Sequence, residues 1–219
     1  MSPAWHAAAT YAVPNIVPPP PLRFDCVLEQ RRSVRAMQRP PLRSIINTIA
    51  FATNVRQIKL DDPLRRSRRP APSGGALHAI DVLVVWPGRE ARVFRYEPFD
   101  HKLLKLAVSD ARKLSVFIQD VANILPSASG ALLLLTGDIR RVAAAYEQPD
   151  SLLWRDAGAL MQTLHLTATA YGQAFCPLGI LGEIALRAVR GDRQLKAVGV
   201  AAIGTQNSIQ AAAGTDRSS

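Results

Sequence analysis

Apolar residues recur along the chain with two different periods, and each period predicts a type of secondary structure. After Pro41, apolar side chains return every three to four residues, which is the spacing of one helix face. These residues are Leu42, Ile45, Ile46 and Ile49. Residues 80–86 and 91–96 are rich in β-branched and aromatic side chains and flank Pro87-Gly88, so they predict a β-hairpin. The apolar run 131–136 predicts a strand buried on both faces.

Helical periodicity also appears in the second half of the chain. Asp100 is a candidate N-cap for a short helix through Leu106, and Asp110 is a candidate N-cap for a longer helix. The longest helical pattern begins after Asp150 or Ser151 and ends near Gly172. Its apolar stripe consists of Leu153, Ala157, Leu160, Leu164, Ala168 and Tyr171. This helix is expected to lie at the core.

The order of these elements predicts the fold class. A short helix at 183–189 and a strand at 198–203 follow the long helix, and no βαβ period appears. The chain is therefore expected to be an α+β protein with a mostly antiparallel central sheet flanked by helices. Residues 1–28 predict an extended proline-rich arm, residues 29–206 the folded domain, and residues 207–219 a flexible tail.

Composition excludes several classes of protein. With 48% hydrophobic and 20% charged residues, the 219-residue chain can bury a sizeable core. No apolar run approaches the roughly 20 residues needed to cross a bilayer, and the start lacks an export signal, so a cytoplasmic protein is expected. Cys26 and Cys176 are too few for a disulfide framework or a zinc site, and both are expected to be reduced.

Positive charge is concentrated early in the chain. Residues 1–75 contain twelve Arg and Lys against four Asp and Glu, which gives +8 of the total formal charge of +10. Such a cluster suits nucleic acid, but it equally suits a single phosphorylated cofactor. Aromatic residues make up only 6% of the chain and do not alternate with the arginines, so base stacking is disfavoured and nucleic acid is an unlikely partner.

The common signatures of cofactor and metal sites are absent. The sequence has no GxxxxGK[ST], no GxGxxG after a strand, no HExxH and no paired CxxC, which disfavours ATP hydrolysis, a Rossmann cofactor and zinc. The four histidines stand singly, so no metal site is expected. Ser73 precedes two glycines but does not form GxSxG, which disfavours a hydrolase nucleophile.

Two short segments remain as candidates for binding a phosphorylated ring compound. In the arginine segment, Arg31–Arg35, extended backbone would direct Arg31, Ser33 and Arg35 to one side, beside Arg32, where they could bind one phosphate. A solvated basic stretch explains the same residues. In the glycine loop, formed by Pro72, Ser73, Gly74 and Gly75, backbone N–H groups could approach a planar ligand, although a plain loop has the same composition.

These segments and one later run together resemble the nitroreductase superfamily. The run extends from Asp156 to Gly179 and contains Asp-Ala-Gly, Gln162 and then Cys176-Pro-Leu-Gly. The order RRSVR, RPAPSGGA, DAG-x-x-x-Q and CPLG is similar to that of the SagB-like dehydrogenase branch of the superfamily. These matches span most of the chain, from Arg31 to Gly179.

The resemblance implies an α+β fold that forms a homodimer with two FMN sites across the interface. It implies that the arginine segment holds the FMN phosphate and that the glycine loop approaches the flavin from the other subunit. A turn of Pro177, Leu178 and Gly179 would lie beside the ring, where backbone N–H groups could bond the flavin N5. Gln162 is expected near the site, although a buried glutamine bonded to backbone fits the sequence equally well.

The sequence departs from the family pattern in two places. Members usually carry a late Arg or Lys after the final strand, but here the stretch is Gly204-Thr205-Gln206, so Arg69 is a candidate substitute. Azoline-oxidising members carry a Lys-Tyr pair before the acidic-Ala-Gly helix, whereas this chain has Ala145-Tyr146. The obvious proton-abstracting base is therefore missing, and Tyr146 is a candidate for positioning the substrate.

Two hypotheses for function follow from this resemblance. The favoured one is an FMN-dependent oxidoreductase that moves a hydride through flavin N5. It would either reduce a nitro or quinone-like acceptor with NAD(P)H as donor or dehydrogenate a small or peptide-derived substrate. The alternative is a non-catalytic module of the same fold with a weak or empty flavin site. The two departures from the family pattern motivate the alternative.

Overall fold

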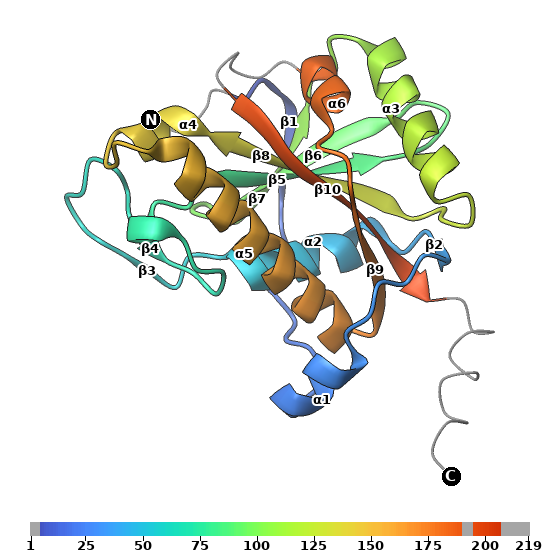
Figure 1. The fold of residues 1–219 in the computed structure, drawn as a ribbon, viewed down its shortest axis with the longest axis horizontal. Helices are drawn as coiled ribbons and strands as arrows, with labels where there is room; N and C mark the ends of the chain where they lie inside the picture. Colours follow the sequence, from blue (N-terminus) through green and yellow to red (C-terminus); the bar gives the residue numbers. More distant parts are fainter. Residues whose placement is uncertain (1–4, 190–194, 207–219) are drawn as a thin grey trace.

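The computed structural model describes residues 5–189 and 195–206, and within them the central element is an eight-stranded antiparallel sheet (Figure 1). The strand order is β1-β7-β6-β5-β8-β10-β2, and β9 pairs with β10 beside this path. The strands are β1 (Ala7–Ala12), β2 (Met37–Gln38), β5 (Ile80–Trp86), β6 (Arg92–Glu97), β7 (Lys102–Leu106), β8 (Ala131–Asp138), β9 (Gln173–Leu178) and β10 (Leu195–Gln206). A separate short pair consists of β3 (Gln57–Ile58) and β4 (Ser67–Arg68).

Helices cover both faces of the sheet, which gives three layers (Figure 1). One face packs against α2 (Leu42–Thr53) and α5 (Pro149–Ala170). The other face packs against α3 (Ala111–Ile124) and α6 (Glu183–Ala188). The predicted α+β class with a mostly antiparallel sheet is therefore confirmed.

The core shows why β8 is the central strand. Every residue of β8 is buried, and its side chains alternate between the two faces. Leu133 and Leu135 join the core under α2 and α5, whereas Leu132 and Leu134 join the core under α3 and α6. Burial of each leucine contributes about 1.5–3 kcal/mol, so this strand supports both cores. The prediction of a strand buried on both faces is confirmed.

The starts of α3 and α5 follow from the residues at their N-termini, an aspartate and a proline. The Asp110 side chain accepts a hydrogen bond from the Lys113 N–H at 3.0 Å and thereby caps α3, as predicted. The α5 helix, however, begins at Pro149 with Gln148 at its N-cap, so the predicted start after Asp150 or Ser151 is late by two or three residues. Proline is favoured at the first helical position because an N–H there has no intrahelical acceptor, so a residue without an N–H loses no hydrogen bond.

Residues 100–106 do not form the predicted helix. Instead Asp100 lies in the turn between β6 and β7, where its N–H donates to the Glu97 side chain at 2.7 Å, and residues 102–106 form β7. Leu103 and Leu106 are buried in different cores, on opposite faces of the sheet. Pairing with β6 determines this conformation, and the local capping signal does not.

Residues 5–30 pack along the chain's own surface. The β1 strand pairs with β7, and the Trp5 indole N–H donates to the Asp81 carboxylate at 2.8 Å. Further along, the Val17 carbonyl accepts hydrogen bonds from Asn47 at 2.8 Å and from Tyr171 at 2.5 Å. The α1 helix spans Phe24–Gln30 and crosses the predicted domain boundary at residue 28. The boundary itself stays a prediction, and the predicted tail 207–219 lies outside the described residues.

Candidate active site

The arginine segment runs extended between α1 and β2 and is anchored through its backbone. The Val34 N–H donates to the Phe175 carbonyl of β9 at 3.0 Å, and the Arg32 carbonyl lies 3.1 Å from His165 Nε2 of α5. Val34 is buried, whereas Ser33 and Arg35 are exposed on either side of it. The segment thus keeps its apolar residue inward and its polar side chains outward.

Two titratable groups behind this segment are held in their uncharged forms. Burial lowers the pKa of His165, and the cationic Arg31 lowers it further against the opposing effect of the Arg32 carbonyl. A neutral His165 must carry its proton on Nε2, because that nitrogen faces a carbonyl acceptor. Burial raises the pKa of the Cys176 thiol, with Arg35 acting in the opposite direction. Cys176 is therefore a neutral thiol beside the segment, and both cysteines are free.

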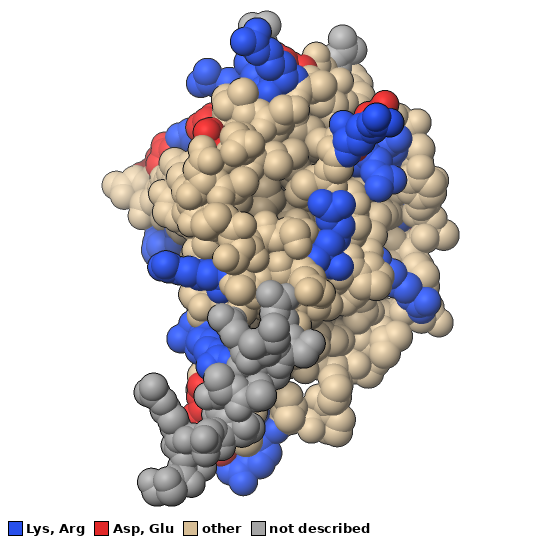
Figure 2. All heavy atoms as spheres, turned by 90° about the vertical axis from the view of Figure 1, so that its right-hand side faces the viewer, with Lys and Arg blue, Asp and Glu red and all other residues tan. Residues whose placement is uncertain are grey.

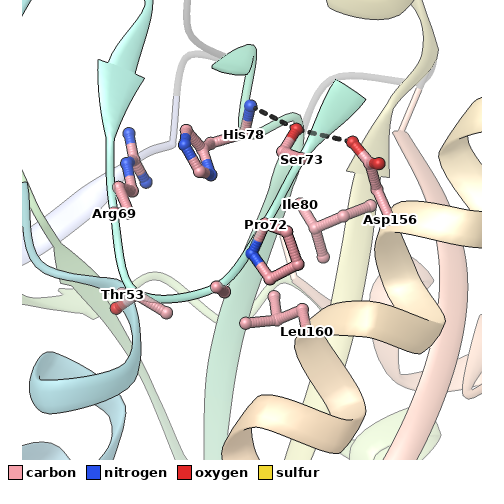
Figure 3. Close-up of a pocket in the computed structure, with 9 residues that line it drawn as sticks. Thr53, Arg69, Pro72, Ser73, His78, Ile80, Asp156 and Leu160 are labelled. Carbon is pink, nitrogen blue, oxygen red and sulfur yellow. Dashed lines mark hydrogen bonds between the residues drawn. The ribbon is translucent and has the colours of Figure 1, made fainter. Parts of the chain in front are cut away.

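The glycine loop lies against the first half of α5 and is held by one carboxylate (Figure 3). The Ser73 hydroxyl donates to Asp156 Oδ2 at 2.6 Å, and the Gly74 N–H donates to the same carboxylate at 3.0 and 3.2 Å. The Ser73 oxygen in turn accepts a hydrogen bond from the His78 N–H at 2.9 Å. The Ser73 hydroxyl and the Gly74 N–H, both predicted cofactor contacts, thus point toward the protein interior.

At two positions of this loop, glycine avoids a close approach to a neighbouring side chain. A Cβ at Gly74 would lie 2.5 Å from the Leu152 side chain, and a Cβ at Gly75 would lie 2.6 Å from the Tyr146 hydroxyl. Gly75 also has a φ of 57°, in the left-handed region that glycine enters without strain. The Tyr146 ring is 41% exposed and covers the loop from outside. Tyr146 therefore belongs with the glycine loop, in which Pro72 is also exposed.

Arg69 also belongs with the glycine loop, where it borders a small cavity. This cavity of about 20 Å³ is lined by Arg69, His78, Asp156 and neighbouring apolar residues (Figure 3). Burial lowers the pKa of Arg69 to about 10. Burial, followed by the charge of Arg69, lowers the pKa of His78 to about 4, so His78 is neutral near pH 7. Arg69 thus lies beside the glycine loop. A substitute for the Arg or Lys that family members carry after the final strand would be expected at the arginine segment instead.

The predicted turn at residues 177–179 is in part a strand. Pro177 and Leu178 belong to β9, where they pair in register with Ala201 and Val200 of β10. Proline is tolerated there because β9 pairs on only one side among the described strands. Gly179 follows the strand, is exposed, and has open space around its Cα. β9 therefore ends at the exposed Gly179, and its residue Phe175 bonds to Val34 of the arginine segment.

Gln162 lies on the exposed face of α5. The interpretation of Gln162 as a buried glutamine bonded to backbone is wrong, because its side chain is solvent-exposed. Trp154 and Gly158 precede it at helical spacing and are exposed as well, and a Cβ at Gly158 would contact nothing within 4 Å. This face, defined by Trp154, Gly158 and Gln162 and called the α5 stripe, runs along the helix.

One chain does not bring the two predicted halves of the site together. The glycine loop contacts Asp156, whereas the arginine segment contacts His165, nine residues further along α5. At 1.5 Å per residue this separates the two contacts by about 14 Å along the helix axis. The arginine segment with the end of β9 forms one half-site, and the glycine loop with Tyr146 forms the other.

The sequence does not reveal the roles of two residues near the predicted site. Asp156 belongs to the Asp-Ala-Gly motif and His165 is a lone histidine, but in the structure they hold the glycine loop and the arginine segment. The signal for Asp156 was its position in the Asp-Ala-Gly run, where a carboxylate within an otherwise apolar helix face requires polar partners.

The positive charge of the chain is distributed over its surface. On the face shown in Figure 2, Lys and Arg side chains lie in separate groups with uncharged surface between them. Several arginines also pack over aromatic rings. These pairs are Arg39 with Trp86, Arg56 with Phe51, Arg65 and Arg69 with Phe99, and Arg92 with Phe94. The visible face therefore lacks the continuous basic stripe typical of nucleic-acid binding.

The antiparallel sheet between two helical layers is the nitroreductase fold. A protein from Ralstonia eutropha described as a nitroreductase has a TM-score of 0.66 at 17% identity, covering 94% of this chain and 95% of its own. The E. coli microcin synthetase complex with truncated pro-MccB17 bound has a TM-score of 0.60 at 18% identity, covering 78% of this chain and 65% of the other. A protein from Exiguobacterium sibiricum described as a nitroreductase in complex with FMN has a TM-score of 0.54 at 13% identity, covering 84% and 89%.

The family assignment comes from the sequence as a whole. The model of the nitroreductase family matches residues 28–205, and the chain belongs to that family. No curated protein matches the sequence. Within residues 5–189 and 195–206, no helix combines the length and the apolar character needed to cross a membrane.

Proposed function

We propose that the protein is a cytoplasmic FMN-dependent oxidoreductase that acts as a homodimer, each flavin site combining the two half-sites of different subunits. The proposal rests on the arginine segment, whose backbone is fixed and whose cationic side chains are available to a ligand. Its backbone is fixed by β9 and α5, and no protein acceptor is recorded for the guanidinium groups of Arg31, Arg32 and Arg35 among the described residues. Cations held in this way are available to a phosphate.

The residues around the segment fit an FMN phosphate and its attached chain. Two guanidinium groups and the exposed Ser33 hydroxyl lie on one extended strand of backbone and can bind several phosphate oxygens together. The exposed end of β9, with Gly179 and its open surroundings, leaves room for a ring beside this segment. The end of β10 offers Thr205, exposed, in place of a basic residue. Phosphate binding therefore depends on Arg31, Arg32 and Arg35.

The second half-site fits the approach of a planar group. Gly75 is exposed, and no acceptor is recorded for its N–H among the described residues. Pro72 and Tyr146 flank it with exposed surface, so the loop can contact one side of a ring without obstruction by a side chain of its own. In the proposed homodimer, the glycine loop of one subunit contacts the flavin held by the arginine segment of the other.

The α5 stripe supports the dimer. Trp154 is 43% exposed although it lies on the longest helix of the described chain, and Gly158 permits another backbone to approach closely. Exposed tryptophan is typical of interfaces because a large apolar surface gains most from burial. Gln162, on the same stripe, would then lie between the subunits near the flavin.

When bound, FMN supplies hydride transfer through N5, and the protein supplies binding, orientation and electrostatics. The cationic arginine segment would hold the phosphate end, and the backbone at Pro177, Leu178 and Gly179 would contact the ring. Tyr146 is placed to orient a substrate over the glycine loop, and the residue before it, Ala145, cannot act as a base. The site therefore favours substrates that can be oxidised or reduced without proton abstraction by a protein side chain.

The direction of the reaction defines two versions of this proposal. A reductase would take a hydride from NAD(P)H and pass it to a nitro or quinone-like acceptor. A SagB-type dehydrogenase would oxidise a small or peptide-derived substrate, and the similarity to a synthetase complex solved with a peptide precursor supports that version. The absence of a basic residue at Gly204-Thr205-Gln206 favours a second candidate function, a binding or assembly module with weak flavin affinity.

Titration of the protein with FMN, followed by quenching of flavin fluorescence, tests the proposal. Replacement of Arg31 and Arg35 by alanine should weaken binding by about 100-fold, because two charge-assisted contacts are lost. The matched control replaces Arg112 of α3 and Arg187 of α6, both exposed, and should leave FMN affinity unchanged. Full FMN affinity in the Arg31 and Arg35 variant would contradict the phosphate assignment.

A further inference from the structure

The carboxylate of Asp156 is placed to fix the conformation of the glycine loop. It is 7% exposed, and it accepts hydrogen bonds only from Ser73 and Gly74 among the described residues. These contacts join positions 83 and 82 residues apart in the sequence. A buried carboxylate is costly unless it is hydrogen-bonded, so the loop and Asp156 stabilise each other.

The backbone of the loop needs such a restraint. Three nearby residues have positive φ, namely Gly75 at 57°, Ala76 at 55° and His78 at 49°. For Ala76 and His78 this region carries a strain of about 1–2 kcal/mol each, because the Cβ approaches the following carbonyl oxygen. The Ser73 hydroxyl connects Asp156 to the His78 N–H, so one carboxylate restrains both sides of the strained turn.

The hydrogen bonds of the loop determine which group it presents outward. The Gly74 N–H is taken by Asp156, the Ala76 N–H by the Ser73 carbonyl at 3.0 Å, and the His78 N–H by the Ser73 hydroxyl. The Gly75 N–H remains without a recorded acceptor among the described residues, on an exposed residue beside Tyr146. The bonded amides thereby leave one donor free at the surface of the loop.

We infer that Asp156 is a positioning residue for the cofactor site: it holds Ser73 and Gly74 inward so that the Gly75 N–H faces a bound flavin. This inference rests on the proposed function, since it takes FMN as the ligand. Because Asp156 is only 7% exposed and bonds to the loop, we assign it no contact with the cofactor or the substrate. Its effect on binding is transmitted through the Gly74 N–H and the Ser73 hydroxyl.

Amide hydrogen exchange in the FMN-free protein and FMN titration together test this role. Asp156→Ala should increase the exchange rate of the Gly74 amide by about 10- to 100-fold, the expected effect of losing a hydrogen bond to a charged acceptor. FMN affinity should fall by about tenfold or more for the same reason. Asp156→Asn retains an acceptor for Gly74 without the charge and should show smaller changes in both. Ser73→Ala keeps the Asp156 carboxylate, so it tests the loop if Asp156→Ala does not fold.

Thr167→Ala is the matched control on the same helix. Thr167 is buried, and among the described residues its hydroxyl bonds only to the Thr163 carbonyl of the same helix, at 2.7 Å. This variant should therefore change neither the Gly74 exchange nor the FMN affinity. Unchanged Gly74 exchange in both Asp156→Ala and Ser73→Ala would overturn the inference, as would altered exchange with unchanged FMN affinity. A wild-type protein that binds no FMN contradicts the proposed function and the flavin-facing role, while exchange still decides whether Asp156 fixes the loop.

Discussion

Replacing Gly75 with alanine perturbs the glycine loop in two separable ways. The residue has a φ of 57°, and a left-handed conformation costs a residue with a Cβ about 1–2 kcal/mol. The new Cβ would also lie 2.6 Å from the Tyr146 hydroxyl and 3.4 Å from two ring carbons. Tyr146 is 41% exposed and can rotate outward, so the steric part should add only about 1 kcal/mol. The free energy of unfolding should therefore fall by about 2–3 kcal/mol.

Urea unfolding and FMN titration measure the two consequences of this substitution. Gly88→Ala is the control, since a Cβ there meets only the Glu90 carbonyl, at 3.7 Å, and its stability should stay within about 0.5 kcal/mol of the wild type. Adding Tyr146→Phe to Gly75→Ala removes the closest clashing atom and should recover the steric part only. If Gly75→Ala matched Gly88→Ala in both stability and FMN affinity, the assignment of Gly75 to a strained, ligand-facing turn would be refuted.

Four further predictions concern stability, assembly and turnover. Because the pKa of His78 is lowered to about 4 from 6.5, the unfolded chain takes up a proton that the folded one resists. Stability should therefore fall by about 2 kcal/mol as the pH falls from 6.5 to 4, and His78→Asn should flatten this part of the unfolding profile. Arg95→Ala leaves a largely buried carboxylate without its cation and should cost about 3 kcal/mol in urea unfolding; a loss below about 1 kcal/mol would show that the ion pair contributes little. Gly158→Arg should lower the dimer fraction in sedimentation without changing monomer stability, and an unchanged fraction would remove the α5 stripe from the interface. Tyr146→Phe should lower kcat with little change in FMN affinity, whereas unchanged kcat with every accepted substrate would leave Tyr146 without a positioning role.

The elements that sequence predicted correctly are those whose pattern is set locally. β8 is apolar at each of residues 131–135 and is buried throughout, so no knowledge of its neighbours was needed. The α3 helix carries both its cap, Asp110, and its apolar spacing within its own sequence. β7 lacks such a local signal, because its conformation follows from pairing with β6 and β1.

The N-terminal strand shows the same limit more clearly. β1 has the sequence Ala-Ala-Ala-Thr-Tyr-Ala, with no apolar alternation and with mostly exposed side chains. Strand propensity depends on the neighbours against which a segment packs, so this stretch becomes a strand only because β7 is available. A proline-rich composition indicated extended backbone but could not indicate the partner.

The candidate site divides in a similar way. Alternation of Arg31, Ser33 and Arg35 could be recognised from spacing, and the burial of Val34 agrees with that geometry. The contact between Asp156 and Ser73 could not be predicted, because it joins segments 83 residues apart through the packing of α5 on the sheet. The inward direction of the Gly74 N–H is a consequence of that tertiary contact.

The visible absorption spectrum of the freshly purified protein, with the released cofactor identified by mass, tests whether the protein binds FMN. We expect flavin absorption bands and a released compound with the mass of FMN, at up to one per chain. A colourless protein that also fails to take up added FMN would contradict this expectation and would favour the non-catalytic binding module.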